Sequence, residues 1–182
     1  WSQWLAANID GVAAECAARG LQTNEPLRCA ALLPALSLID GPIALLEVGA
    51  SAGLCLYPDR YSYRYESGQD LDPAGGQSPV VLRSSARGLP SLHLPEVVWR
   101  AGIDLAPLDA ASEADRRFLT SLVWPGEEGR RERIVAALDV VRAEPPTLIS
   151  GDATADGLLA QLAAEAPGDA TLVVTTPGVL PH

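Results

Sequence analysis

The segment from Ile43 to Gly53 constrains the fold of this chain more than any other. A short apolar run, Ile43 to Val48, contains one carboxylate, Glu47, near its end, and Gly49-Ala50-Ser51-Ala52-Gly53 follows at once. An apolar run of this length without polar alternation is typical of a strand buried on both faces of a parallel sheet. A turn of small residues after such a strand lets a ligand approach the backbone. We therefore expect a ligand site at the carboxyl end of this strand.

Around this segment, helical and strand patterns alternate along the chain. The spacing predicts an N-terminal helical segment over residues 1–41, in which Thr23 or Asn24 caps the second helix ahead of Pro26. Strands that alternate with helices predict a mostly parallel, doubly wound α/β sheet of the Rossmann-like type over residues 42–182. The expected core strands are 43–48, 97–105, 147–150 and 170–176, and the expected helices between them are 112–124, 127–144 and 156–165.

An insertion is expected at about residues 58–96, before the second core strand. Residues 60–66 alternate tyrosines with polar side chains, which is typical of a strand. A loop rich in glycine and aspartate separates this run from a second strand at 79–83. The pattern predicts a β-hairpin inserted into the α/β order. Its tyrosines are expected either to pack against neighbouring side chains or to line a pocket for the substrate.

Charge and composition narrow the range of partners. The formal net charge is −10, and a field of that sign repels phosphate backbones, so nucleic acid is not expected as a partner. No apolar run reaches the roughly 18 residues that a membrane span needs. The three cysteines are widely spaced, which fits a reducing cytoplasm, and the two histidines lack metal-binding spacing. We expect a cytoplasmic protein without a membrane segment or a metal site, whose oligomeric state the sequence leaves open.

Two interpretations of the glycine turn come from well-known motifs. Dinucleotide binding requires G-x-G-x-x-G, and Ser51 and Leu54 occupy two of the glycine positions. A serine hydrolase is the second interpretation, because residues 49–53 match the G-x-S-x-G nucleophile elbow. That fold requires several strands before the elbow and a histidine after it, whereas the preceding residues look helical and only His93 and His182 are available. Both interpretations are therefore weaker than a third.

The third interpretation is a site for S-adenosylmethionine (SAM). Glu47, Gly49, Ser51 and Gly53 resemble the first sequence motif of SAM-dependent methyltransferases, with serine in place of the commonest glycine. The serine is still a small residue at a strand-to-helix turn. Taken alone, this motif is only moderately specific, because short glycine-rich turns recur by chance.

Polar residues at the ends of the later strands strengthen this interpretation. Asp104 ends the second core strand, where such enzymes place an acid on the ribose hydroxyls, and Asp152 ends the third, where they place an acid on the adenine amino group. Thr175-Thr176-Pro177 ends the fourth, where methyltransferases often carry substrate or catalytic residues. A carboxylate that accepts two hydroxyl hydrogen bonds holds a diol well, although each aspartate is also a possible helix cap. The expected cofactor-binding residues are Glu47, Gly49, Ser51, Gly53, Asp104 and Asp152.

One set of stretches lies at 22–26, 46–54, 59–61, 78–81, 99–104, 107–109, 122–125 and 151–152. Together these stretches resemble one bacterial family, the uncharacterised proteins grouped as domain of unknown function 2332. The resemblance implies a methyltransferase-like fold and brings no established activity. Cys55 stands where asparagine is expected in that family, and the tail from Thr175 to His182 departs from the usual continuation. A complete methyltransferase sheet has about three more strands, so the C-terminal strands are expected to be missing.

The sequence favours a SAM-dependent methyltransferase-like protein whose acceptor, a small molecule or a protein, the residues do not identify. The expected reaction is in-line transfer from the sulfonium to a nucleophile, helped by positioning and desolvation, and no residue stands out as a general base. The alternative is a non-catalytic module that binds a nucleoside metabolite or a protein. Fold alone does not decide between these functions.

Overall fold

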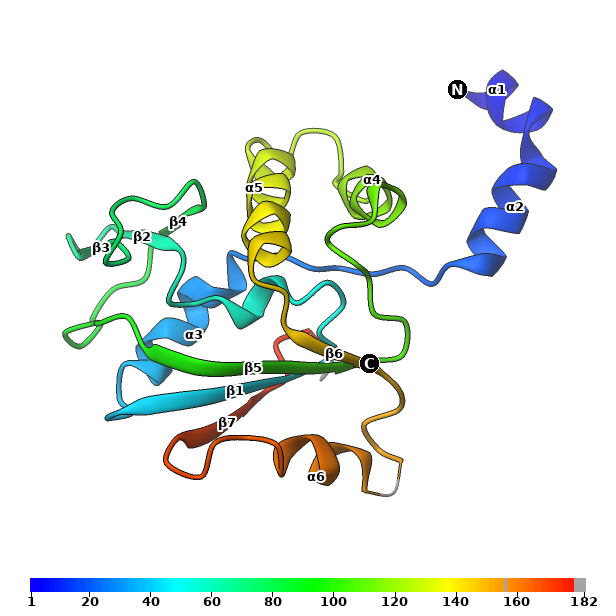
Figure 1. The fold of residues 1–182 in the computed structure, drawn as a ribbon. Coiled ribbons are helices and arrows are strands. Elements are labelled where there is room, and N and C mark those ends of the chain that lie inside the picture. Colours follow the sequence, from blue (N-terminus) through cyan, green and yellow to red (C-terminus); the bar gives the residue numbers. More distant parts are fainter. Residues whose placement is uncertain (156, 179–182) are drawn as a thin grey trace.

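The centre of the molecule is a four-stranded sheet in which every neighbouring pair of strands is parallel (Figure 1). The computed structural model describes residues 1–155 and 157–178. The sheet confirms the predicted parallel α/β architecture, and each core strand lies within one residue of its expected bounds. In spatial order the strands are β6 (Thr147–Ser150), β5 (Glu96–Asp104), β1 (Pro42–Val48) and β7 (Thr171–Thr175).

The molecule has two hydrophobic cores, one on each face of the central sheet, and strand β1 contributes side chains to both. This explains why the sequence of β1 is apolar without alternation. Ile43 and Leu45 are buried in the larger core, and Leu46 is buried in the smaller one on the opposite face. Successive side chains of a strand point to opposite faces, so a strand covered on both sides needs apolar residues at every position.

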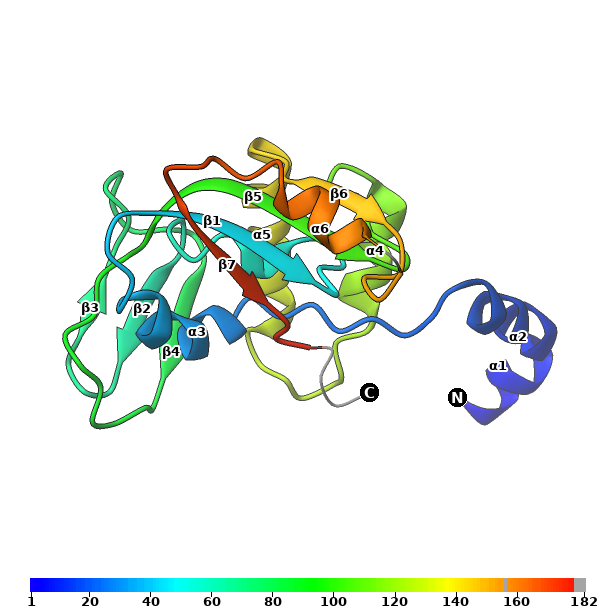
Figure 2. The ribbon, with the colours of Figure 1, turned by 90° about the horizontal axis from the view of Figure 1, so that it is seen from below.

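Helices cover both faces of the sheet unequally. On one face lie α3 (Arg28–Leu36), α4 (Glu113–Ser121) and α5 (Arg130–Ala143), and their buried side chains belong to the larger core (Figure 1). On the other face, α6 (Leu158–Ala163) lies across β5 and β6 and buries Leu162 in the smaller core (Figure 2). Ser112 caps α4, because its hydroxyl accepts a hydrogen bond from the N–H of Asp115.

The first two helices form an arm that stands away from this body (Figures 1 and 2). Neither α1 (Ser2–Ala7) nor α2 (Ile9–Ala18) has a buried residue, and Trp1 is 93% exposed. Within the described part of the chain, no helix is both long and apolar enough to cross a membrane.

The predicted cap of the helix that follows the arm is wrong. Helix α3 begins at Arg28 after Leu27, and neither Thr23 nor Asn24 caps it. The Asn24 amide instead donates to the carbonyl of Ala50, and the Thr23 hydroxyl accepts from Arg28. These side chains have partners elsewhere in the structure, which compete with the local capping interaction.

The insertion forms a second, three-stranded sheet in the order β3-β2-β4. It consists of β2 (Ser62–Tyr65), β3 (Asp70–Leu71) and β4 (Val81–Ser84). The predicted hairpin between the two longer strands is wrong, because β2 and β4 are parallel and the antiparallel pair is β2 with β3. Gly68, with φ of +86°, allows a tight turn after β2, so the chain reverses twice before it enters β4.

The tyrosines of this insertion belong to the core. The hydroxyls of Tyr61, Tyr63 and Tyr65 are bonded to the carbonyls of Leu54, Pro58 and Ala30, respectively. Buried tyrosines usually satisfy their hydroxyls in this way. Of the two expectations for these side chains, the structure therefore supports packing. Leu54 lies in the short 3-10 helix η1 (Leu54–Leu56), which follows the glycine turn.

Candidate functional site

A pocket of about 460 Å³ lies where the carboxyl ends of β1, β5 and β6 meet. Its volume is within the range of about 300–1,000 Å³ that is usual for small-molecule sites. The strands β5 and β6 lie on one side of β1 and β7 on the other, so the direction of winding changes beside β1. Open parallel sheets bind ligands outside the carboxyl ends of their strands at such a point. The pocket is lined by Gly20–Thr23, Arg28, Val48, Gly49, Ser51, Ile103–Ala106, Gly151–Thr154 and Gly178.

The glycine turn after β1 forms one wall of this pocket. Gly49 has φ of +76°, and its N–H donates to the carbonyl of Ile103 at 2.8 Å. Ser51 has φ of +52°, a left-handed conformation that costs a residue with a side chain about 1–2 kcal/mol. Its position is that of a glycine in the motif that the turn resembles. The strained turn is therefore held by interactions outside it.

Asp104 is the residue that holds Ser51 in place. Its Oδ2 accepts from the N–H of Ser51 at 2.7 Å, and its Oδ1 accepts from the N–H of Ala106 at 2.9 Å. A carboxylate has about four acceptor positions, so each oxygen keeps one for a further donor. Asp104 thus joins the turn after β1 to the loop after β5 and still has acceptors available at the pocket.

Asp152 lines the same pocket after β6 and is exposed. Its Oδ1 accepts from the hydroxyl of Thr154 at 2.6 Å and from the N–H of Thr154 at 2.8 Å. These two hydrogen bonds, the hydroxyl first, lower the pKa of Asp152, so the side chain is a carboxylate at neutral pH. Its Oδ2 remains available to a ligand.

Glu47 lies one residue before the pocket wall, in the interior of the sheet. The residue is 2% exposed and stands between Gly102 of β5 and Thr175 of β7. Its Oε2 has no hydrogen-bond partner among the described residues, which is rare for a buried polar atom. Burial is the main cause that raises the pKa of Glu47; Cys55 and Asp104 raise it further, and Arg28 opposes them.

Gly53 and Gly102 matter because a side chain at either position would crowd its neighbours, and neither glycine lines the pocket. Gly53 does not line the pocket, and a Cβ there would stand 3.2 Å from Pro146 Cγ on the core side of the turn. Gly102 was not predicted as a site residue. A Cβ on it would overlap the Ala50 side chain and stand 2.9 Å from Leu148 Cδ2, so only glycine lets the turn lie on β5.

Residues 20–28, which we call the strap, cross the strand ends and close one side of the pocket. The Gln22 side chain donates to the carbonyl of Ala106 at 2.7 Å and accepts from the Ser51 hydroxyl. Glu25 anchors the strap to α5 through Arg130 and Arg133, with closest distances of 2.9 and 2.8 Å. Gln22, Thr23 and Arg28 were missed as pocket residues, although a polar run between two helical stretches was visible in the sequence.

The histidines needed by a hydrolase are not brought to Ser51 within the described residues. His93 is bonded through its backbone to the hydroxyl of Ser37, which precedes the amino end of β1. His182 lies outside the described residues. The described residues contain no group of three or more side chains that could hold a metal ion.

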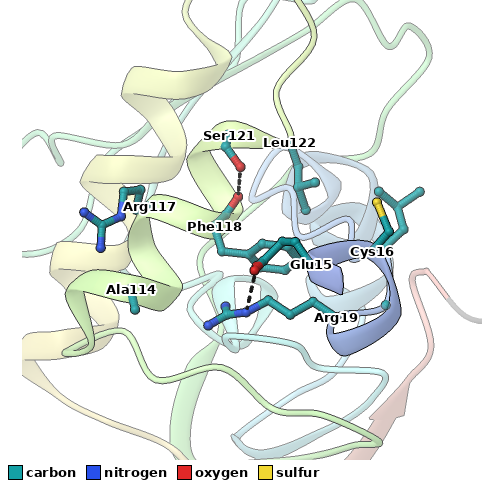
Figure 3. A pocket seen from close by; sticks show the side chains of 10 residues that line it. Glu15, Cys16, Arg19, Ala114, Arg117, Phe118, Ser121 and Leu122 are labelled. Carbon is teal, nitrogen blue, oxygen red and sulfur yellow. Dashed lines mark hydrogen bonds and ion pairs between the residues drawn. The ribbon is translucent and has the colours of Figure 1, made fainter. Parts of the chain in front are cut away.

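A larger hollow, of about 600 Å³, lies between α2 and α4 and away from the strand ends (Figure 3). Figure 3 shows Arg19 beneath Phe118, with the guanidinium carbon 4.9 Å from the ring centroid. Arg19 is already paired with Glu15 and Asp115. This hollow lies where Arg19, the residue after α2, contacts α4, and none of the predicted site residues line it.

Comparison with known proteins agrees with the resemblance seen in the sequence. No curated protein and no solved structure matches the chain. The profile of one family, described as uncharacterized protein conserved in bacteria (DUF2332), matches residues 2–181. The chain therefore belongs to this bacterial family.

Proposed function

We propose that the pocket binds SAM and that the protein is a SAM-dependent, methyltransferase-like protein with a Rossmann-like fold. One observation carries this proposal: Gly49, Ser51, Asp104 and Asp152, which lie at the carboxyl ends of three different strands, line a single pocket. The spatial order of the strands supports it, because the pocket lies where doubly wound folds hold nucleotides.

Each strand end has a distinct role in this proposal. Gly49 brings backbone to the ligand, since no side chain intervenes. The free acceptor positions of Asp104 receive the ribose hydroxyls, and Asp152 receives the adenine amino group. The unpartnered Oε2 of Glu47 supports a cationic or hydrogen-bond-donating ligand near the end of β1.

The chemistry follows from SAM, which supplies an electrophilic methyl group on its sulfonium. The protein holds the cofactor at the strand ends and orients the acceptor in line with the methyl group, and such positioning supplies much of the rate acceleration. The acceptor is a small molecule or a protein.

Non-catalytic binding of a nucleoside metabolite or a protein is the second candidate. Both Asp104 and Asp152 bond to the backbone of their own loops, so each also acts as a structural residue. A hydrolase is not proposed, because the Ser51 hydroxyl donates to Gln22 instead of a described histidine. Labelling of Ser51 by a fluorophosphonate would favour the hydrolase.

Calorimetry with SAM and S-adenosylhomocysteine tests the proposal. We expect the wild-type protein to bind at least one of them, and Asp104→Asn to weaken binding about 10- to 100-fold, the usual value of a hydrogen bond to a charged group. Asp169→Asn is the matched control, because Asp169 is an exposed aspartate in the loop before β7. Absence of binding by the wild-type protein would refute the proposal. Transfer of a methyl group to an acceptor would then separate an enzyme from a binding module.

A further inference from the structure

The strap places an arginine in the pocket whose bonding capacity is largely unused. Arg28 lines the pocket, and its only hydrogen bond among the described residues runs from Nη2 to the Thr23 hydroxyl at 3.1 Å. A guanidinium has five N–H donors. Arg28 takes part in no ion pair among the described residues, whereas Arg130 and Arg133, which anchor the strap, are both paired with Glu25.

The nearby carboxylates do not neutralise Arg28. Asp104 and Asp152 line the same pocket, but Asp104 accepts from the N–H groups of Ser51 and Ala106, and Asp152 accepts from Thr154. Glu47 lies near enough for Arg28 to lower its pKa, yet no ion pair joins them. A guanidinium and a buried, unpartnered carboxyl therefore lie close to the same strand end without contacting each other.

These two groups complement an α-amino acid group: Arg28 offers N–H donors to its carboxylate, and the unpartnered Glu47 Oε2 offers an acceptor to its ammonium group. We propose that Arg28, oriented by Thr23, binds the carboxylate of an amino-acid tail on the bound nucleoside, while Glu47 faces its ammonium group. The inference rests on the proposed function and extends it: the pocket selects nucleosides that carry an amino-acid tail over nucleosides that lack one. Arginine suits this role because its planar fork bonds a carboxylate through two parallel hydrogen bonds.

The position of Arg28 fits a tail-binding group. It is the first residue of α3, at the end of the strap, and Gly178 after β7 lies so close that a Cβ there would stand 2.5 Å from Arg28 Nη1. Asp152 belongs to the loop after β6, at the other edge of the sheet from β7. A ligand held by Asp152 at its base and by Arg28 at its tail would cross the glycine turn between them.

The test compares ligands that differ only in the tail. S-adenosylhomocysteine carries the amino-acid group, and 5′-methylthioadenosine lacks it. For the wild-type full chain, we expect calorimetry to show that S-adenosylhomocysteine binds at least about 10-fold more tightly than 5′-methylthioadenosine. This is the gain that one additional hydrogen bond between charged groups provides. In Arg28→Gln this preference should disappear: the affinity for S-adenosylhomocysteine falls about 10- to 100-fold, and that for 5′-methylthioadenosine stays within about threefold.

Control variants keep the inference falsifiable. Arg131→Gln removes an exposed arginine of α5 and should leave both affinities unchanged. Thr23→Val removes only the hydroxyl that orients Arg28 and should reduce the preference several-fold in the same direction, which tests the inference if Arg28→Gln does not fold.

Three results would overturn the inference, and they are distinguishable. Equal wild-type affinity for the two ligands would exclude recognition of the tail while leaving nucleoside binding intact. Equal weakening of both ligands in Arg28→Gln would show that Arg28 acts only on the structure of the pocket. Failure of the wild-type chain to bind either ligand would refute the proposed function together with this extension.

Discussion

Glu47→Gln should stabilise the fold at neutral pH and weaken ligand binding. The wild-type carboxyl is 2% exposed, and its Oε2 has no partner among the described residues. Glutamine has nearly the same shape but does not ionise. The substitution therefore removes the cost of a buried charge with little change in packing.

The stability difference should depend on pH in a defined direction. Burial raises the pKa of Glu47 in the folded protein, whereas in the unfolded chain the pKa is near its ordinary value of about 4.3. Between these two values the folded state binds more protons than the unfolded state, so wild-type stability falls as pH rises. Above the raised pKa, the wild-type stability has lost the whole contribution of this group and no longer changes with pH because of it. Glu47→Gln lacks this titration, so its advantage should grow from about pH 4.3 upward and then level off.

The expected size follows from the raised pKa of Glu47. Each pKa unit of such a rise corresponds to about 1.4 kcal/mol, so we expect a stability gain of at least about 1 kcal/mol at the plateau. For a chain of this size, each kcal/mol raises Tm by about 2–4 °C.

Urea unfolding of the wild type and Glu47→Gln between pH 5 and 8 measures this difference, with the exposed Glu128→Gln as control. A difference that does not change with pH, or that shrinks as pH rises, would refute the reasoning. The same variant should bind S-adenosylhomocysteine about 10-fold more weakly, because the glutamine amide is a poorer acceptor than the carboxyl group for the ligand's ammonium group.

Two further substitutions test how the pocket wall is built. Gly102→Ala should destabilise the fold by about 1–3 kcal/mol in urea unfolding, because the new methyl group overlaps Ala50; a loss below about 0.5 kcal/mol would mean that the turn moves aside freely. Asn24→Ala should cost about 1–3 kcal/mol, because the amide that bonds the carbonyl of Ala50 is lost, and hydrogen exchange of residues 49–53 should accelerate; unchanged exchange would show that the strap does not restrain the turn.

The core strands were predictable because their signals are local. The apolar run before Gly49 requires a strand covered on both faces, whatever the rest of the chain does. The course of the insertion was not predictable, because the reversal at Gly68 is hidden within a loop rich in glycine and aspartate. A two-residue strand such as β3 has no sequence period from which it could be recognised.

The candidate site was predictable only in part, for a related reason. Asp104 is the last residue of β5 and Asp152 comes two residues after β6, and parallel topology brings such positions together. Gln22 and Asn24 act on backbone groups at Ala106 and Ala50, far away in the sequence, so their local pattern resembled a helix cap. The lack of a partner for Glu47 Oε2 is a property of three-dimensional packing, and no sequence pattern reports it.

The most direct test of the central claim, that three strand ends hold one nucleoside, is to map the bound ligand on the protein. Amide chemical shifts of the ¹⁵N-labelled full chain would be followed during titration with S-adenosylhomocysteine. We predict that the shifts concentrate at residues 48–53, 103–106 and 151–154 and on the strap. Shifts that are absent at saturating ligand, or that gather around the hollow between α2 and α4, would contradict the claim.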